Sequence, residues 1–413
     1  MSQQQAWRAR AGGTFAALHH TDFRLFWSAV ALSAAGQTLW RGTQNWQILQ
    51  LTDAPFALGL AGFMSTFPSL LLALFAGAIS DNVPKRTILL IAHGAYAAGV
   101  ALLALLTGFR IIELWHILVL ALSMGIVSAF WFPTRQASVP ELLPKEQVMN
   151  GIALNSTGFY TASFAGAAAL GWLLSVGGIH GAYVVASGVF VFAVVSLRAA
   201  HWDPQGKAEP GRRFIWNEVV RGLAYIRSNR VVLTLLGATA VGSVFHSAPQ
   251  VLMPVFARDI LDVGEQGYGY LTAANTLGSF FGALTLASLG DYRGKGLLIL
   301  TTLVIQGVSQ TLFGLSGNFY LSLMALTFNG IASALHISAL ITVIQLASPP
   351  EFRGRIMGLY FLVFQGLAPI GSLYTGTVAQ LLTAPFAVVF GGIALMLAGL
   401  GLLWRSTDLR RFS

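Results

Sequence analysis

The chain has 413 residues, of which 55% are hydrophobic and only 9% are charged. Soluble globular domains carry roughly a quarter charged residues, so this composition excludes that class. The absence of cysteine excludes disulfides, thiol chemistry and iron–sulfur clusters. The formal net charge is +9, which alone would allow nucleic-acid binding, so the placement of the basic residues decides between a nucleic-acid partner and a membrane.

The apolar residues form long blocks separated by short polar stretches. A helix needs about 20 predominantly apolar residues to cross the hydrocarbon core of a bilayer. The sequence therefore predicts an all-α integral membrane protein with twelve transmembrane helices in two pseudo-symmetric six-helix bundles. In chain order, the helices are expected near residues 25–50, 57–80, 86–108, 113–133, 149–176, 180–199, 231–257, 266–290, 296–315, 318–346, 354–381 and 384–404.

The basic residues indicate how these helices are oriented. Apart from Arg41, Arg110 and Arg258, every Lys and Arg falls on the side of the predicted helices that the N-terminus shares. Loops that remain in the cytoplasm carry such an excess of Lys and Arg. We therefore expect a multi-pass membrane protein with both termini in the cytoplasm, and no nucleic acid as partner.

One long polar stretch divides the chain. Residues 201–230 contain Asp203-Pro204 and several charges, followed by apolar residues at helical spacing, which is typical of an amphipathic helix on a membrane surface. We predict three parts: an N-terminal bundle (1–200), a cytoplasmic linker with an amphipathic helix (201–230) and a C-terminal bundle (231–413).

Two short segments show that the halves are related. Residues 77–86 have the sequence GAISDNVPKR and residues 287–296 have the sequence ASLGDYRGKG, so Asp81 and Asp291 each follow a small residue by four positions and precede a lysine by four. A second set recurs at one constant offset: Pro144, Glu146, Gly166 and Gly171 return as Pro349, Glu351, Gly371 and Gly376. Internal repeats in a membrane chain are typical of secondary transporters, whose substrate path lies between the repeats.

The first segment resembles the loop between helices 2 and 3 of the major facilitator superfamily, although Asn82 and Pro84 replace residues usual there. The wider chain is similar to the branch that includes the enterobactin exporter and drug-efflux permeases. The segments that carry this resemblance are WQILQLTDAPFALGL, VPELLPKEQVMNGIALNS and EFRGRIMGLYFL. The resemblance implies a twelve-helix transporter of the bacterial inner membrane that works by alternating access.

Charged residues at the cytoplasmic border are expected to form a gate. A carboxylate there can accept hydrogen bonds from the N-terminus of a neighbouring helix, whose partial positive charge favours it. Asp81 is expected to meet the start of helix 11 and Asp291 the start of helix 5. The predicted gate comprises Asp81, Lys85, Arg86, Arg135 at the end of helix 4, Asp291, Arg293, Lys295, Arg353 and Arg355.

Arg41 is placed deep within helix 1, where an arginine is costly and usually faces a cavity or a partner. It either binds an anionic substrate or gates the outer side, or it has a structural role, snorkelling to the outer interface or pairing with Asp53 or Asp259. Helices 1, 4, 7 and 10 are expected to line a substrate cavity with Arg41, Gln44, Asn45, His246, Gln250 and His336.

Glycines within helices allow close contacts between helix backbones in lipid. Gly166, Gly171, Gly278 and Gly282 are such positions. They either serve packing alone or provide smooth contacts, between helices 5 and 8 and between 2 and 11, that slide during transport.

No Asp or Glu lies in the middle of a predicted helix, although proton-driven antiporters generally keep a carboxylate within the membrane. Ala121 and Ala167 stand where the resemblance would place the arginine and proline of drug–proton antiporters. Coupling to protons would then use a border acid such as Asp22 or Asp259, one of the histidines His93, His246 and His336, or the substrate itself. The histidine spacing does not suggest a metal site.

The preferred function is export of an amphipathic small molecule, drug-like or a siderophore, by an antiporter or other secondary transporter coupled to protons or another ion. Two alternatives stay open: uptake of a small anionic solute or flipping of a lysophospholipid, and a transport-inactive receptor or scaffold. The chain contains no phosphate-binding loop and no catalytic motif. We therefore expect no enzyme activity and no cofactor, and a monomer whose partners are its substrate and the bilayer.

Overall fold

The computed structural model describes residues 13, 15–202, 229–289 and 294–406; for residues 73–82, 286–289, 350, 351, 353 and 355 it describes the backbone only. No strand occurs in these ranges. The helices are α2 (Thr21–Thr52), α3 (Pro55–Asn82), α4 (Lys85–Gly108), α5 (Leu114–Leu142), α6 (Val148–Ala199), α8 (Arg230–Phe245), α9 (Ala248–Val255), α10 (Gly264–Leu289), α11 (Lys295–Leu315), α12 (Phe319–Ala347), α13 (Pro350–Leu381) and α14 (Ala384–Arg405), with short turns η1 (Ala16–His19), η2 (Lys145–Gln147) and η3 (Phe256–Ile260).

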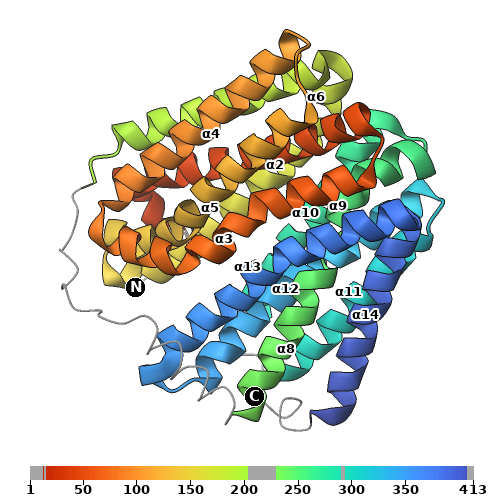
Figure 1. Ribbon diagram of the computed structural model, residues 1–413. Helices are drawn as coiled ribbons and strands as arrows, with labels where there is room; N and C mark the ends of the chain where they lie inside the picture. Colours follow the sequence, from red (N-terminus) through yellow and green to blue (C-terminus); the bar gives the residue numbers. More distant parts are fainter. Residues whose placement is uncertain (1–12, 14, 203–228, 290–293, 407–413) are drawn as a thin grey trace, which may run out of the picture.

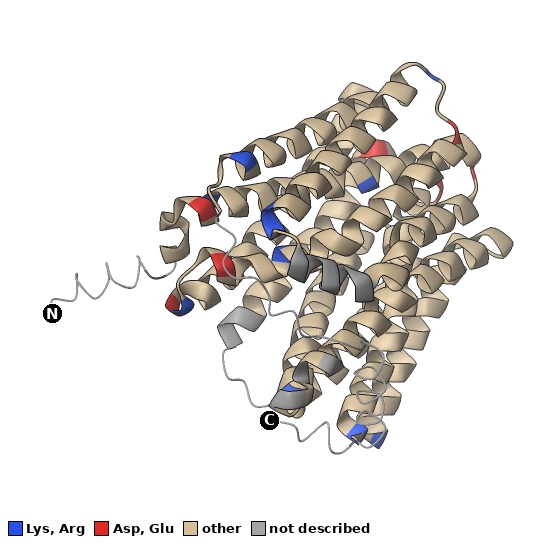
Figure 2. Ribbon diagram, turned by 60° about the vertical axis from the view of Figure 1, so that its left-hand side comes forward, with Lys and Arg blue, Asp and Glu red and all other residues tan. Residues whose placement is uncertain are grey.

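The helices are long and apolar, as a bilayer requires. Within the described ranges, nine helical segments have the length and hydropathy to cross a membrane. Helices suit this environment because they satisfy their own backbone hydrogen bonds, which lipid cannot do. Figure 2 shows that charged residues gather toward the ends of the helices, which leaves their middle stretches almost free of charge.

The helices pack in two groups, α2 to α6 and α8 to α14 (Figure 1). The groups lie closest where α2 ends at Thr52 and α3 begins at Pro55, which we call the convergent end. They diverge toward the end at which α2 begins and α14 finishes, the divergent end. The predicted amphipathic helix of the linker lies outside the described residues.

Two helices are interrupted at defined residues. α6 contains Gly178 with φ of 63° and ψ of −172°, a conformation that reverses the chain between two helical segments and that glycine adopts without steric cost. The helix expected at 231–257 is broken at His246 and Ser247, between α8 and α9, and finishes in the π-helical turn η3. π-helical turns occur mostly as single turns, frequently at functional sites.

The predicted boundaries agree with the observed ones to within a few residues, except in α5. This helix continues past Pro133 and Pro140 to Leu142. Proline is tolerated within membrane helices because neighbouring helices and side chains satisfy the backbone groups that it leaves without hydrogen bonds. Arg135 therefore lies within α5 and is only 7% exposed. The prediction that Arg135 stands at the end of helix 4 is wrong.

Two crossings of small residues join the groups. A Cβ added to Gly59 of α3 would lie 2.7 Å from the Cα of Gly376 in α13. One added to Gly269 of α10 would lie 2.5 Å from the Cα of Gly171 in α6. The backbones thus touch directly, where helices 2 and 11 and helices 5 and 8 were expected to meet.

The other predicted glycines pack within one group. Gly166 faces Ala35 of α2, while Gly278 and Gly282 face α12. Of the four glycines, only Gly171 lies between the groups.

We predict that Gly171→Val forces α6 away from α10, because an added Cβ at this position would lie 2.8 Å from the carbonyl oxygen of Glu265. Overpacking of about 1–3 kcal/mol corresponds to a fall of roughly 1–4 °C in the unfolding temperature of a chain of this length, measured on the purified protein in detergent. Gly188→Val, in the second segment of α6 and with no atom within 4 Å of an added Cβ, is the matched control. Equal shifts for both variants would contradict the assignment.

Candidate functional site

A cavity of about 480 Å³ lies between the two groups of helices. Its wall combines hydroxyl, amide and aromatic side chains with one arginine. The N-terminal group contributes Thr38, Trp40, Arg41, Gly42, Gln44, Asn45, Ala61, Gly62, Ser65 and Thr66; the C-terminal group contributes Ser243, His246, Ser247, Gln250, Val251, Met253, Tyr268, Thr272, Asn275, Thr276, Phe364, Gln365, Ala368 and Ser372.

Five of the six predicted cavity residues line this space: Arg41, Gln44, Asn45, His246 and Gln250. On α2, Arg41 and Asn45 are four residues apart and therefore share a helix face. The break between α8 and α9 places His246 on the wall, and Gln250 follows one turn later on α9. His336 does not reach this cavity.

The set of lining helices differs from the expectation. Expected helices 1 and 7, which are α2 and the pair α8 and α9, do line the cavity. Expected helices 4 and 10, which are α5 and α12, contribute no residue to the described wall. α3, α10 and α13 take their places, because these helices cross at the convergent end and their next turns border the space beneath. Their hydroxyl and amide residues, such as Asn275 and Gln365, give no signal in a hydropathy profile.

The cavity is closed toward the convergent end by α10. Tyr268 stacks on Trp46 with ring centroids 5.4 Å apart, and its hydroxyl donates to the backbone oxygen of Gly42 at 3.2 Å. Tyr268 is 3% exposed and Trp46 is equally buried. The two groups of helices thus meet through an aromatic pair directly above the cavity wall.

A small chamber of about 20 Å³ adjoins the cavity within the C-terminal group. His246, Ser243 and Phe364 line both spaces. The remaining wall of the chamber consists of Thr239, Gly242, Gln306, Ser333, His336, Ile337, Leu340 and Tyr360.

The two histidines of the chamber are held by hydrogen bonds. Nε2 of Gln306 donates to Nδ1 of His246 at 2.5 Å, which leaves Nε2 of His246 facing the hydroxyl of Ser333 at 3.4 Å. His336 lies 3.1 Å from the carbonyl oxygen of Ile299 through Nδ1. Its Nε2 is buried and has no hydrogen-bond partner in the described structure.

A row of amides connects the chamber to the cavity. Asn275 on the cavity wall donates to Oδ1 of Asn329 at 3.4 Å. Asn329 in turn donates to the backbone oxygen of Gln306 at 3.3 Å. The imidazole of His246 is therefore tied to Gln306 of α11, α12 is tied to the same residue, and α10 is tied to α12.

The other residues predicted for proton coupling lie away from the cavity. His93 is fully buried in α4, where Nδ1 donates to the carbonyl oxygen of Leu89 at 2.6 Å and the ring meets Trp131 edge-on. Oδ1 of Asp22 accepts from the backbone nitrogen of His201 at 2.8 Å. Asp259 lies in η3 and binds Arg258.

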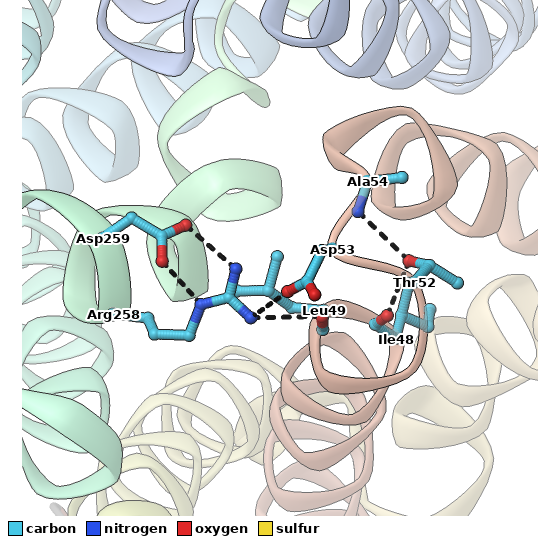
Figure 3. Close-up of polar contacts among 7 residues, drawn as sticks. All are labelled: Ile48, Leu49, Thr52, Asp53, Ala54, Arg258 and Asp259. Atoms are coloured by element: carbon cyan, nitrogen blue, oxygen red, sulfur yellow. Dashed lines mark hydrogen bonds and ion pairs between the residues drawn. The ribbon is translucent and has the colours of Figure 1, made fainter.

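Arg258 links the two groups at the convergent end (Figure 3). Its Nη1 donates to Oδ1 of Asp53 at 2.6 Å and to the carbonyl oxygen of Leu49 at 3.3 Å. Asp259 holds the opposite edge of the guanidinium, at 2.6 Å to Nε and 3.1 Å to Nη2. We call Arg258, Asp53 and Asp259 the latch; the sequence placed Arg258 only as an outer-side exception to the charge bias.

The latch also decides one alternative left open for Arg41. Asp53 and Asp259 both bind Arg258, and no ion pair joins either of them to Arg41 in the described structure. Asp53 can take its place because it ends α2 in the left-handed conformation, with φ of 49°, which Asp adopts more readily than most residues.

The predicted cytoplasmic gate is described only in part. Lys85 forms an ion pair with Glu141 of α5. Arg86 donates to the backbone oxygens of Leu197 and Arg198, at 3.4 and 2.8 Å. Lys295 begins α11. The side chains of Asp81, Asp291, Arg293, Arg353 and Arg355 lie outside the described residues.

Arg135 packs against aromatic rings. Its guanidinium carbon lies 4.5 Å from the ring centroid of Phe159 and 5.0 Å from that of Trp131. Nε and Nη1 are buried and make no hydrogen bond within the described structure.

Across the described ranges, no group of three or more metal-ligating side chains gathers that could hold a metal ion.

Comparison with known proteins places these features in a family. The model of the transmembrane secretion effector family of the major facilitator superfamily matches residues 12–411. The enterobactin exporters EntS of Shigella boydii serotype 18 and of Escherichia coli O157:H7 are each 26% identical over 398 residues, covering 95% of this chain and 94% of theirs.

Solved structures with 10–13% identity share the fold. The nucleoside transporter NupG superposes with a TM-score of 0.77, covering 93% of this chain and 99% of its own. A bacterial homologue of the lysosomal transporter Spinster, in an inward-facing and occupied conformation, reaches 0.72 and covers 95% and 98%. A peptide transporter of the POT family with bound alafosfalin reaches 0.76 and covers 94% and 95%.

Proposed function

This chain belongs to the transmembrane secretion effector family of major facilitator transporters, and we propose that it exports an amphipathic small molecule across the bacterial inner membrane by alternating access. The observation that carries the proposal is the cavity between the two groups of helices. Its wall offers amides and hydroxyls beside Trp40, Tyr268 and Phe364, which suits a molecule with both polar and apolar parts. The similarity to enterobactin exporters supports export as the direction of transport.

We propose twelve membrane spans. The nine segments long and apolar enough to span a bilayer count α6 once, although Gly178 reverses the chain within it. α2 and α10 are absent from the nine because they carry polar residues such as Arg41 and Asn275 that face the cavity, which lowers their mean hydropathy. Two spans in α6, with α2 and α10 added, give the proposed count.

The positive-inside rule assigns the divergent end to the cytoplasm, because α2 begins there and the basic residues Lys85, Arg86 and Lys295 mark the helices on that side. The convergent end then faces outward, and the conformation is inward-facing. In this scheme the latch and the two glycine crossings keep the outer side closed. Opening that side requires the contacts of Arg258 with α2 to break, while the predicted cytoplasmic gate forms.

We propose His246 as the group that couples transport to protons. Of the titratable residues near it, His336 and Tyr360 line the chamber, while Arg41 and Tyr268 line the cavity. Protonation of Nδ1 would place two donors face to face, because Gln306 already donates there. The amide of Gln306 must then rotate to present its oxygen, and Gln306 is also the residue of α11 whose backbone oxygen Asn329 binds.

The test of the transport function is a reconstitution experiment. Purified protein in liposomes of known orientation is expected to move an amphipathic dye from the cytoplasmic to the outer side when a pH gradient is imposed, and sodium is tested separately. Depletion of dye on the cytoplasmic side supports export, and accumulation there supports the uptake alternative. A chain that moves no compound of a broad panel in either direction would leave only the receptor or scaffold function.

We predict that Asp53→Asn weakens closure of the outer side, because it removes the charge by which α2 holds Arg258. Exposed ion pairs contribute about 0.2–1 kcal/mol, equivalent to a roughly 1.4- to 5-fold shift in population. Since the chain has no cysteine, Thr276→Cys on the cavity wall provides a single thiol, and an impermeant maleimide added outside should label it faster by that factor.

The matched control for this latch variant is Asp259→Asn. It removes a carboxylate of the same arginine without removing a contact between the two groups, so the labelling rate should change less. If the two variants label alike, the latch does not close the outer side.

We predict that a pH gradient no longer accelerates dye efflux by His246→Gln, so that the ratio of rates with and without the gradient is about 1. The variant removes the titratable ring and keeps a hydrogen-bonding side chain, so binding of the dye should persist. His19→Gln, an exposed residue at the start of the chain, should keep the full acceleration. A His246→Gln protein that still responds to the pH gradient would exclude this residue as the coupling group.

A further inference from the structure

The cavity wall carries a positive charge without a counter-ion. Arg41 is the only charged side chain among the described residues that line the cavity. It is exposed to this space, and no hydrogen bond or ion pair joins it to another described residue. Its guanidinium carbon lies 5.5 Å from the ring centroid of Trp40.

The acids that could have neutralised Arg41 are engaged elsewhere. Asp53 and Asp259, the two acids expected to pair with Arg41, both bind Arg258. An arginine within a membrane helix is costly unless it faces water or a partner of opposite charge. The cavity therefore retains a cation that its own described wall does not pair.

Gln44 adds a second unsatisfied group on the same wall. It lies three residues after Arg41 on α2 and lines the cavity, yet it is only 4% exposed. Its Oε1 has no hydrogen-bond partner within the described structure. A buried amide oxygen without a donor is destabilising by about 1–3 kcal/mol, so a hydrogen-bond donor on a bound molecule would relieve it.

Resting on the transport function proposed above, we infer that the substrate is an amphipathic organic anion that also carries a hydrogen-bond donor. Its carboxylate, sulfonate, phosphate or deprotonated phenol binds the planar guanidinium of Arg41, which can hold two oxygens at once. A hydroxyl or N–H close to that group donates to Gln44. The apolar part of the molecule lies against Trp40, Tyr268 and Phe364.

The charge of Arg41 should discriminate strongly between anionic, neutral and cationic substrates. When the cavity closes around a bound molecule and excludes bulk water, the attraction between opposite charges, or the repulsion between like ones, becomes several times larger than in solution. A lipophilic cation would meet Arg41 with no acid nearby on the described wall to offset the repulsion. A neutral molecule of the same shape would leave the arginine unpaired when the cavity closes around it.

The test compares two dyes with the same aromatic skeleton. 8-Anilino-1-naphthalenesulfonate carries a negative charge and an N–H, whereas N-phenyl-1-naphthylamine has the N–H but no charge. Binding of each to the full chain in lipid nanodiscs is measured against empty nanodiscs. The wild-type chain is expected to prefer the sulfonate, and Arg41→Gln is expected to weaken sulfonate binding roughly 10- to 100-fold while neutral-dye binding changes less than about 3-fold.

Two further variants complete the design. Arg41→Lys keeps the charge and should recover part of the sulfonate binding, and Arg110→Asn removes an exposed loop cation and should change neither dye. Persistent binding of the neutral dye shows that Arg41→Gln is folded.

The inference is overturned if wild-type protein binds the neutral dye as tightly as the sulfonate, if it binds no sulfonate, or if Arg41→Gln weakens both dyes equally. Transport of a neutral compound by the wild-type chain would then still stand as its function. Failure to move any compound would instead remove the proposed transport function itself.

Discussion

Direct contact between helix backbones at one end of the molecule determines the rest of the architecture. Gly59 meets Gly376 and Gly171 meets Gly269 with no side chain between them. In lipid no hydrophobic force draws helices together, so close van der Waals packing of small residues holds them. Because these contacts lie at the convergent end, the helices separate beyond them and leave the space that Arg41 lines.

That space explains why the polar residues of this chain can exist at membrane depth. The helix is interrupted at His246 and Ser247, which line this wall, and irregular backbone at membrane depth is tolerated only where it lines a cavity or is buried in protein. Tyr268 and Trp46 cover the wall from the convergent side. The same wall thus carries both the irregular backbone and the polar side chains.

Much of the fold could be predicted from the sequence, because the length of the apolar blocks is a direct consequence of bilayer thickness. The cavity position of Arg41 followed from the cost of a charge within a span. The predicted end of α5 was wrong because a proline such as Pro133 usually ends a helix that is exposed to water, whereas a helix packed among other helices can continue past it. The role of Arg258 depends on Asp53, which lies in the other group of helices. The lining helices were predicted only in part, since a hydropathy pattern does not show how far along their lengths two helices cross.

The lack of an acid in the described cavity wall bears on how such a transporter could be driven. A carboxylate beside Arg41 would compete with an anionic substrate, whereas a neutral histidine does not. When His246 gains a proton, an anion is bound more strongly, and this coupling is reciprocal. This coupling by itself would carry the proton and the anion across the membrane in the same direction. An exporter driven by proton entry must instead release the proton on the side of the membrane opposite to the substrate. The chamber behind His246, with His336 buried within it, offers the proton a position apart from the substrate, and a proton-driven exporter built on this wall needs that separation.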